Sequence, residues 1–370
     1  MKIVYANNID PEYPMDIERD YLSQFFPDKK CFLFTDTNIN RIKDIDDVLR
    51  SIDNLDSILI DTTHNPVGLK QNMFGTFCKG QSIQNIEQLV GFCKDYAPTV
   101  VLHTDFNYVA DTPNYFYFPV WLWMWSARLP LWYGNEFFKK QYGPKPRFYD
   151  VIENKTQGMC CLNRTPNWHR ILFFNAVAEK PWLSKISYTF GNHGHGKRYE
   201  DAFYFLRPDE IAEFESKKHH LPYILIEGDR QDTTDVGVSH PVWSTHTFNL
   251  VTESAMDNTF LSEKTAKPFV SKMIPIILGP RNTAKHLQQA GLDMFGDIIP
   301  WHTWDDLADP RDRVKAVVEF LDEFLQQDLV AIYHANKHRV NRNKEVFHSE
   351  QFRKNITAEM LKLSSSLGTD

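Results

Sequence analysis

Glu263 and Lys264 form the charged pair whose position gives the clearest indication of chemistry. They follow Ser262 and open a segment with helical character that precedes the apolar run 273–278. The first N–H groups of a helix and the positive end of its dipole favour a phosphate, and the ammonium of Lys264 would add a full charge. The pattern predicts a phosphate site where this helix begins, whereas an ordinary solvated helix start is the alternative.

The surrounding sequence contains three short runs in a fixed order: FNLVTE at 248–253, SEK at 262–264 and PIILG at 275–279. This order and spacing resemble the α-1,3-fucosyltransferases, which carry Phe-x-Leu-x-x-Glu, then Thr-Glu-Lys or Ser-Glu-Lys, then Pro-x-x-x-Gly. A second match is the run LNRTPNWHR at 162–170, which resembles the strand-then-helix segment that supplies a phosphate-contacting Arg in that family. Together with the run SEKTAKP, it is also similar to fucosyltransferase-related proteins of tailed bacteriophages.

The resemblance covers the second half of the chain well and the first half weakly. It implies an α/β protein with the GT-B fold, in which two Rossmann-like domains face a central cleft. The implied activity is inverting transfer of a sugar from a nucleotide sugar, a UDP- or GDP-sugar, to a hydroxyl acceptor, with no bound cofactor and no metal in the catalytic step. The implied donor-binding residues are Arg170, Lys264, Asn163, Glu253 and Gly279, and Glu263 is both a donor contact and a catalytic candidate.

Such a transfer needs a base that removes the acceptor proton and cationic groups that stabilise the departing diphosphate. The apolar run 99–102 leads to Asp105, which resembles the family's strand ending in a catalytic carboxylate, although the family has Glu there. We therefore expect Asp105 to be the base. Asp111 and His103 are the competing candidates, and a turn or capping role is common for an Asp at a strand end.

An aromatic segment follows this region and contains Trp121 and Trp123. Its rings could stack on an acceptor sugar or base, although core packing is the favoured interpretation. The loop 191–198 carries two His residues two positions apart without companion ligands, so no metal site is predicted. No Walker loop or G-x-G-x-x-G is present, which disfavours a nucleotide hydrolase or a dehydrogenase.

The elements that must position these residues alternate between β and α character. Short β-branched or aromatic runs recur along the chain, at 2–5, 31–34, 57–60, 99–102, 159–162, 185–189, 223–226, 247–251 and 273–278. The segment 137–155 breaks the alternation and predicts a linker. We expect an acceptor domain at 1–150, a donor domain at 151–335 and a basic tail or helix at 336–370. Residues 313–327 predict an amphipathic helix.

Composition limits the class of protein. Of 370 residues, 42% are hydrophobic and 14% aromatic, as in a globular protein, and the net charge of −7 gives no global field for nucleic acid. The five cysteines lack a C-x-x-C spacing and are expected to be free thiols. Without a signal peptide or a clean apolar span, we expect a cytoplasmic protein of a bacterium or a phage-infected cell, without a membrane.

Two alternatives to a transferase that acts on a carbohydrate remain. The phage-like runs favour a transferase that glycosylates 5-hydroxymethylcytosine in DNA, with phosphates contacted by the basic stretch 337–354 and by linker residues Lys139, Lys140, Lys145 and Arg147. The other is a non-catalytic module that binds a sugar or a nucleotide. The sequence leaves the acceptor, glycan or hydroxymethylated DNA, and the oligomeric state open.

Overall fold

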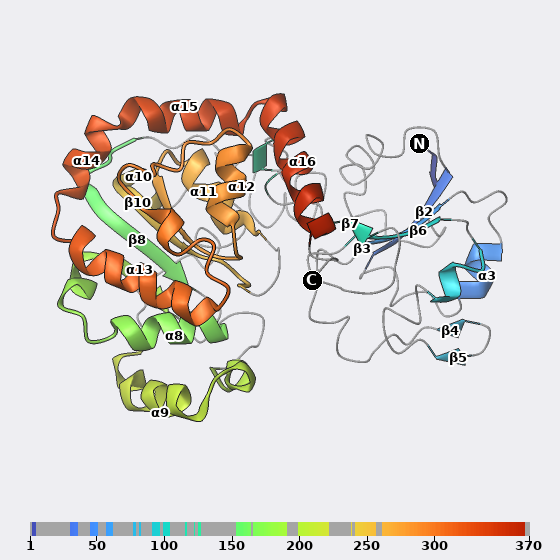
Figure 1. Cartoon of the computed structure of the whole chain (residues 1–370), viewed down its shortest axis with the longest axis horizontal. Coiled ribbons are helices and arrows are strands. Elements are labelled where there is room, and N and C mark those ends of the chain that lie inside the picture. The colour runs from blue at the N-terminus through green and yellow to red at the C-terminus, as the bar shows by residue number, and fades with distance from the viewer. Residues whose placement is uncertain are drawn as a thin grey trace. The chain divides into compact units, whose positions relative to one another are not determined.

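A computed structural model gives the arrangement of the chain (Figure 1). It describes residues 2–4, 30–35, 45–50, 57–61, 77–78, 81–82, 91–96, 99–103, 115–116, 122, 125–126, 153–163, 166–190, 199–221, 238, 241–256 and 261–366. The chain divides into two compact units. Unit 1 comprises Met1–Val120, Leu131–Pro144 and Met360–Asp370, and unit 2 comprises Trp121–Pro130 and Lys145–Glu359.

Unit 1 contains a five-stranded sheet whose neighbouring strands are all parallel. Its order is β1 (Lys2–Val4), β2 (Lys30–Thr35), β3 (Ser57–Asp61), β6 (Thr99–His103) and β7 (Tyr115–Phe116). The unit also contains helix α3 (Ile45–Arg50) and the antiparallel pair β4 (Phe77–Cys78) and β5 (Gln81–Ser82). The parallel sheet agrees with the β/α alternation of the sequence.

Unit 2 is built on a four-stranded parallel sheet with the order β11-β10-β8-β9. Its strands are β8 (Gln157–Asn163), β9 (Ser187–Phe190), β10 (His246–Thr252) and β11 (Ile274–Leu278). Along the chain, β8 is followed by β9 on one side, whereas β10 is followed by β11 on the other. Neighbouring strands whose connections leave in opposite directions create a crevice at their carboxyl ends. In this sheet the crevice lies between β8 and β10.

Helices and 3-10 turns make up the rest of the secondary structure described in unit 2. In chain order they are α8 (Trp168–Val177), η1 (Pro181–Lys185), η2 (Tyr199–Phe205), α9 (Pro208–Lys217), η3 (Lys218–His220), α10 (Pro241–Thr245), α11 (Glu263–Val270), α12 (Thr283–Gln289), η4 (Trp301–Thr303), α13 (Pro310–Phe324), α14 (Leu329–Ala335), α15 (Lys337–Phe347) and α16 (Glu350–Ser366). The last helix, α16, extends past Glu359 into residues assigned to unit 1. Helix α8 packs beside α13, and α11 packs beside α15 (Figure 1).

Successive side chains of β10 face opposite sides of the unit 2 sheet. Phe248 and Leu250 of β10 join the large apolar cluster that contains residues of α8 and α13. Asn249 and Val251 point the other way, because successive side chains of a strand face opposite sides of the sheet. All seven residues of β10 are buried, and Asn249 is one of the four polar residues among them.

The structure confirms most of the secondary structure expected from the sequence. The apolar runs at 2–5, 31–34, 57–60, 99–102, 159–162, 185–189, 247–251 and 273–278 coincide with strands, and α13 confirms the amphipathic helix expected at 313–327. The run 223–226 and most of the expected linker lie outside the described residues. Cys93, Cys160 and Cys161 are free and buried, as predicted. No helix in the described part of the chain is both long and apolar enough to cross a membrane.

Candidate functional site

The site lies at the carboxyl edge of the unit 2 sheet, where β8 and β10 end side by side. The last residue of β8, Asn163, and the last residue of β10, Thr252, are joined by a hydrogen bond from the Thr252 hydroxyl to Oδ1 of Asn163. Both side chains are buried. This hydrogen bond joins the ends of β8 and β10 at the point where the connections of the sheet diverge.

Helix α11 begins beside this crevice, and its first turn is occupied by a carboxylate of the protein itself. Glu253 is fully buried, and its side chain accepts the backbone N–H of Ser262 at 3.1 Å and of Thr265 at 3.2 Å. It also accepts the Ser262 hydroxyl at 2.6 Å and the hydroxyl of Thr265. The N–H of Lys264 goes to the Ser262 hydroxyl at 3.2 Å. Our expectation of free N–H groups for a phosphate was therefore wrong at these three positions.

Gly279 makes this arrangement possible. A Cβ at this position would lie 3.3 Å from Cγ and 3.4 Å from Cβ of Glu253. Such distances are tighter than most Cβ contacts in proteins, so a side chain here would require Glu253 to shift by a few tenths of an ångström. Gly279 thus belongs to the site through the space that it leaves for Glu253.

Lys264 supplies the cation of the crevice. Its side chain is 26% exposed, and Nζ lies 2.8 Å from Oε1 of Glu263 and 3.1 Å from Oγ of Ser254. The Glu263 side chain is only 5% exposed. The ammonium of Lys264 is therefore accessible to solvent, whereas the carboxylate of Glu263 is buried.

Arg170 is close to this pair but is buried, with 1% of its surface exposed. Its Nη2 donates to the carbonyl oxygen of Thr252 at 2.8 Å and to that of Glu253 at 3.1 Å. Burial lowers the pKa of the guanidinium. In this structure Arg170 fixes the end of β10, and a direct contact with a donor remains a prediction.

His169 reinforces the same strand end and was not identified from the sequence. Its Nε2 lies 2.7 Å from the carbonyl oxygen of Glu253. Because a carbonyl only accepts, Nε2 carries the proton. Burial, together with the charge of Arg170, lowers the pKa of His169 to about 3, so the ring is neutral at pH 7. The sequence signal for this role was that His169 and Arg170 lie side by side at the start of a mostly apolar helix.

Arg313 of α13 was also missed. It is 2% exposed, and Nη2 donates to the carbonyl oxygen of Met256 at 2.6 Å, while Nη1 donates to that of Ala308 at 3.2 Å. Together with Arg170, it holds the backbone that leaves β10. A lone Arg on the apolar face of a predicted amphipathic helix could have indicated a buried anchor of this kind.

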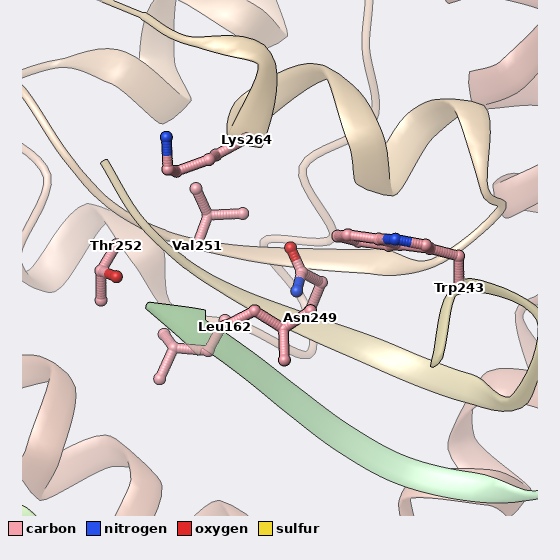
Figure 2. Close-up of a pocket in the computed structure, with 7 residues that line it drawn as sticks. Leu162, Trp243, Asn249, Val251, Thr252 and Lys264 are labelled. Carbon is pink, nitrogen blue, oxygen red and sulfur yellow. The ribbon is translucent and has the colours of Figure 1, made fainter. Parts of the chain in front are cut away.

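A small pocket lies along β10 beside Lys264 (Figure 2). Its volume is about 20 Å³, whereas pockets that bury a drug-sized ligand measure roughly 300–1,000 Å³. This pocket can hold one chemical group, not a whole nucleotide. It is lined by Leu162, Trp243, Asn249, Leu250, Val251, Thr252 and Lys264, of which Trp243 and Asn249 were not singled out from the sequence.

The expected acceptor side of the site is outside the described part of the chain. This holds for Asp105, Asp111, Trp121 and Trp123. His103 is the last residue of β6, but its side chain is not described. The structure therefore leaves the identity of the base as a prediction.

Three of the six Lys and Arg residues in the basic stretch that could contact DNA form ion pairs with carboxylates in unit 2. The ion pairs join Lys337 to Glu153, Arg339 to Asp293 and Asp297, and Lys354 to Glu350. The hydrogen bonds that Arg339 donates to both aspartates raise the pKa of its guanidinium. A phosphate at this surface would have to compete with these partners.

Comparisons with known proteins identify no relative: neither the protein-family models nor the curated proteins include a match to this chain. Within the ranges that the structure describes, no group of three or more His, Cys, Asp or Glu side chains is arranged to hold a metal ion. The functional interpretation therefore depends on the geometry of the crevice and on the motifs of the sequence.

Proposed function

We propose that this chain is an inverting glycosyltransferase of GT-B architecture, and that the diphosphate of a UDP- or GDP-sugar binds beside Lys264. The observation that carries the proposal is the partly exposed side chain of Lys264, 26% accessible, at the crevice between β8 and β10. Ligands of open α/β sheets bind in such crevices, outside the carboxyl ends of the strands. The resemblance to α-1,3-fucosyltransferases names the same residue.

The chemistry follows from the charge that develops on the leaving group. The acceptor hydroxyl attacks the anomeric carbon, a carboxylate takes its proton, and the bond from that carbon to the diphosphate oxygen breaks. The electron pair stays on the diphosphate, so a fixed cation beside it lowers the barrier. Lys264 is the proposed cation, Asp105 is the proposed base, and Glu263 holds Lys264 in position.

Arg170 has two possible parts in this scheme. As a donor ligand it would contact the diphosphate, and as a buried brace it positions the strand end next to Lys264. We propose the second part together with His169, because Nη2 of Arg170 and Nε2 of His169 already hold the same carbonyl oxygen. Asn163, Glu253 and Gly279 then shape the site and do not touch the donor.

The direct test is thermal stabilisation by UDP and by GDP in excess chelator. A ligand that binds only the folded chain raises the melting temperature, by mass action. Lys264→Met should weaken binding by about 10–100-fold, the value of a hydrogen bond to a charged group, and Lys264→Arg should retain part of it. Lys315→Met on α13, where Lys315 is 76% exposed, is the matched control. A shift that requires Mg²⁺ or Mn²⁺ contradicts the metal-independent mechanism.

Turnover separates the proposed enzyme from a binding module. The wild-type chain should release UDP or GDP from one nucleotide sugar in a panel followed by mass spectrometry. Acceptor assays should then compare glycans with duplex DNA that contains 5-hydroxymethylcytosine. Nucleotide binding without turnover on any acceptor indicates a non-catalytic module, and product on DNA that falls steeply with salt indicates a DNA-modifying transferase.

A further inference from the structure

Asn249 has a hydrogen-bonding group that the described residues leave unused. It is 4% exposed and lies in the middle of the buried strand β10. Its Nδ2 donates to Sγ of Cys160 at 3.2 Å and to the carbonyl oxygen of Cys160 at 3.4 Å. No described residue donates to its Oδ1. Figure 2 shows this oxygen directed toward the space between Val251 and Trp243.

Trp243 lines the same pocket and carries a buried hydrogen-bond donor. Its indole is 3% exposed, and Nε1 is buried without a hydrogen-bond partner among the described residues. Buried indole N–H groups usually have a partner. Nζ of Lys267 lies 5.4 Å from the centre of the ring, so the indole is held from one face.

Both residues line the small pocket beside Lys264 (Figure 2). The pocket volume of about 20 Å³ exceeds the about 10–15 Å³ that one water molecule needs. A hydroxyl group fits this pair, because it can accept from the indole N–H and donate to the amide oxygen at the same time.

We propose that the pocket formed by Trp243 and Asn249 is a subsite for a single hydroxyl group of the bound ligand. This inference rests on the proposed function, because the hydroxyl belongs to a nucleotide sugar whose diphosphate lies at Lys264. The hydroxyl has two possible sources, the ribose of the nucleotide or the transferred sugar. In both cases the subsite should bind a ligand that carries this hydroxyl more tightly than the analogue that lacks it. Without the hydroxyl, the indole N–H of Trp243 and Oδ1 of Asn249 would have no hydrogen-bond partner in the described part of the chain.

The experiment follows the indole N–H of Trp243 by NMR in the full chain labelled with ¹⁵N-tryptophan, with its signal assigned by Trp243→Phe. The ligands are UDP and GDP, their 2′-deoxy and 3′-deoxy forms, and the nucleotide sugars with their deoxy-sugar analogues. We expect the signal to move with a hydroxylated ligand and to remain in place with the one analogue that lacks the bound hydroxyl. That analogue identifies the source as ribose or sugar.

Affinity gives the second readout. Trp243→Phe should weaken the hydroxylated ligand by about three- to tenfold, the value of a neutral hydrogen bond, and should leave the matching deoxy ligand unchanged. Trp301→Phe is the control, because Nε1 of Trp301 is also buried and unpaired among the described residues but belongs to η4, away from the pocket. Asn249→Leu, checked by its melting temperature, should reproduce the loss.

The outcomes distinguish this inference from the proposed function. If UDP or GDP binds but the Trp243 signal and the Trp243→Phe affinity do not change, the pocket holds only an internal water and the subsite is overturned, while the diphosphate site stands. If no nucleotide binds, the proposed function fails, and free monosaccharides at high concentration then test the subsite alone. A Trp243 shift with them supports the subsite, and its absence overturns it.

Discussion

Oε2 of Glu253 accepts a hydrogen bond of 2.6 Å from the hydroxyl of Ser262, the residue that caps helix α11. The two residues are nine positions apart, yet they form one unit, because the same carboxylate also accepts the Ser262 N–H at 3.1 Å. An internal anion therefore replaces an external one at the start of this helix. The contribution of this carboxylate to the stability of the chain can be measured with variants.

Glu253→Gln should lower the stability of the chain. The amide keeps one oxygen but turns an NH₂ group toward N–H donors, so a buried charged acceptor with several hydrogen bonds is lost. We expect the free energy of unfolding to fall by about 2–4 kcal/mol, measured by urea unfolding. Glu319→Gln, at a side chain that is 66% exposed, should change it by less than about 0.5 kcal/mol. Equal effects of the two variants would contradict the buried capping role.

Gly279→Ala should have a related effect through packing. The added methyl group would lie 3.3 Å from Cγ of Glu253 and would require Glu253 to shift, at a cost of about 1–3 kcal/mol. Gly91→Ala is the matched control, because no heavy atom lies within 4 Å of a Cβ at that position. If Gly279→Ala is as stable as the wild type, the close approach of Glu253 is not required.

The pH dependence of stability should carry the signature of Asp305. Burial raises the pKa of this carboxyl to about 6, although the N–H groups of Ala284 and Lys285 donate to it. In the folded chain it keeps its proton up to about that pH, whereas in the unfolded chain it loses the proton near 3.8. The folded state binds more protons in this window, so Asp305 removes stability as the pH rises from about 4 to about 6.

Asp305→Asn lacks this titration. The difference in unfolding free energy between the wild type and the variant should therefore change by roughly 1–3 kcal/mol between pH 4 and pH 6, and should be constant above that range. Urea unfolding at a series of pH values measures the difference directly. Parallel stability curves for the two proteins would show that Asp305 titrates normally in the folded chain.

Asp105→Asn tests the proposed general base, which lies outside the described residues. The substitution keeps the size of the side chain and removes its basicity, so turnover should fall by about 10²–10⁴-fold. Donor affinity should hardly change, because Lys264 belongs to the other unit of the chain. Near-normal turnover, with loss of activity in Asp111→Asn or His103→Ala, would assign the base to another residue of the same region.

Most strands of the two sheets could be predicted from the sequence because they are short apolar runs bounded by turn residues, whereas β7 was not among the predicted runs. The run 247–251, for example, became the fully buried strand β10. Helix α13 followed from its apolar face, of which Val314, Val317 and Leu321 are buried. These features depend on local periodicity, which a sequence records directly.

The interior of the site could not be predicted in the same way. The motif spacing identified Glu253, Lys264 and Gly279, but not that Glu253 fills the start of α11 or that Gly279 leaves room for it. These contacts join residues on different elements, so no local pattern encodes them. Part of the fucosyltransferase-like spacing is thus explained by packing around one buried carboxylate.

The central position of β10 also affects how unit 2 folds. Asn249 pairs with Cys160 of β8, 89 residues earlier in the chain. Loop closure over such a distance must precede the contacts that stabilise it, and parallel pairings of this kind form slowly. During synthesis β8 can pair with β9 on one edge, but its other edge lacks a partner strand until β10 has been made. We expect newly made chains that stop short of residue 246 to depend on chaperones and to aggregate without them.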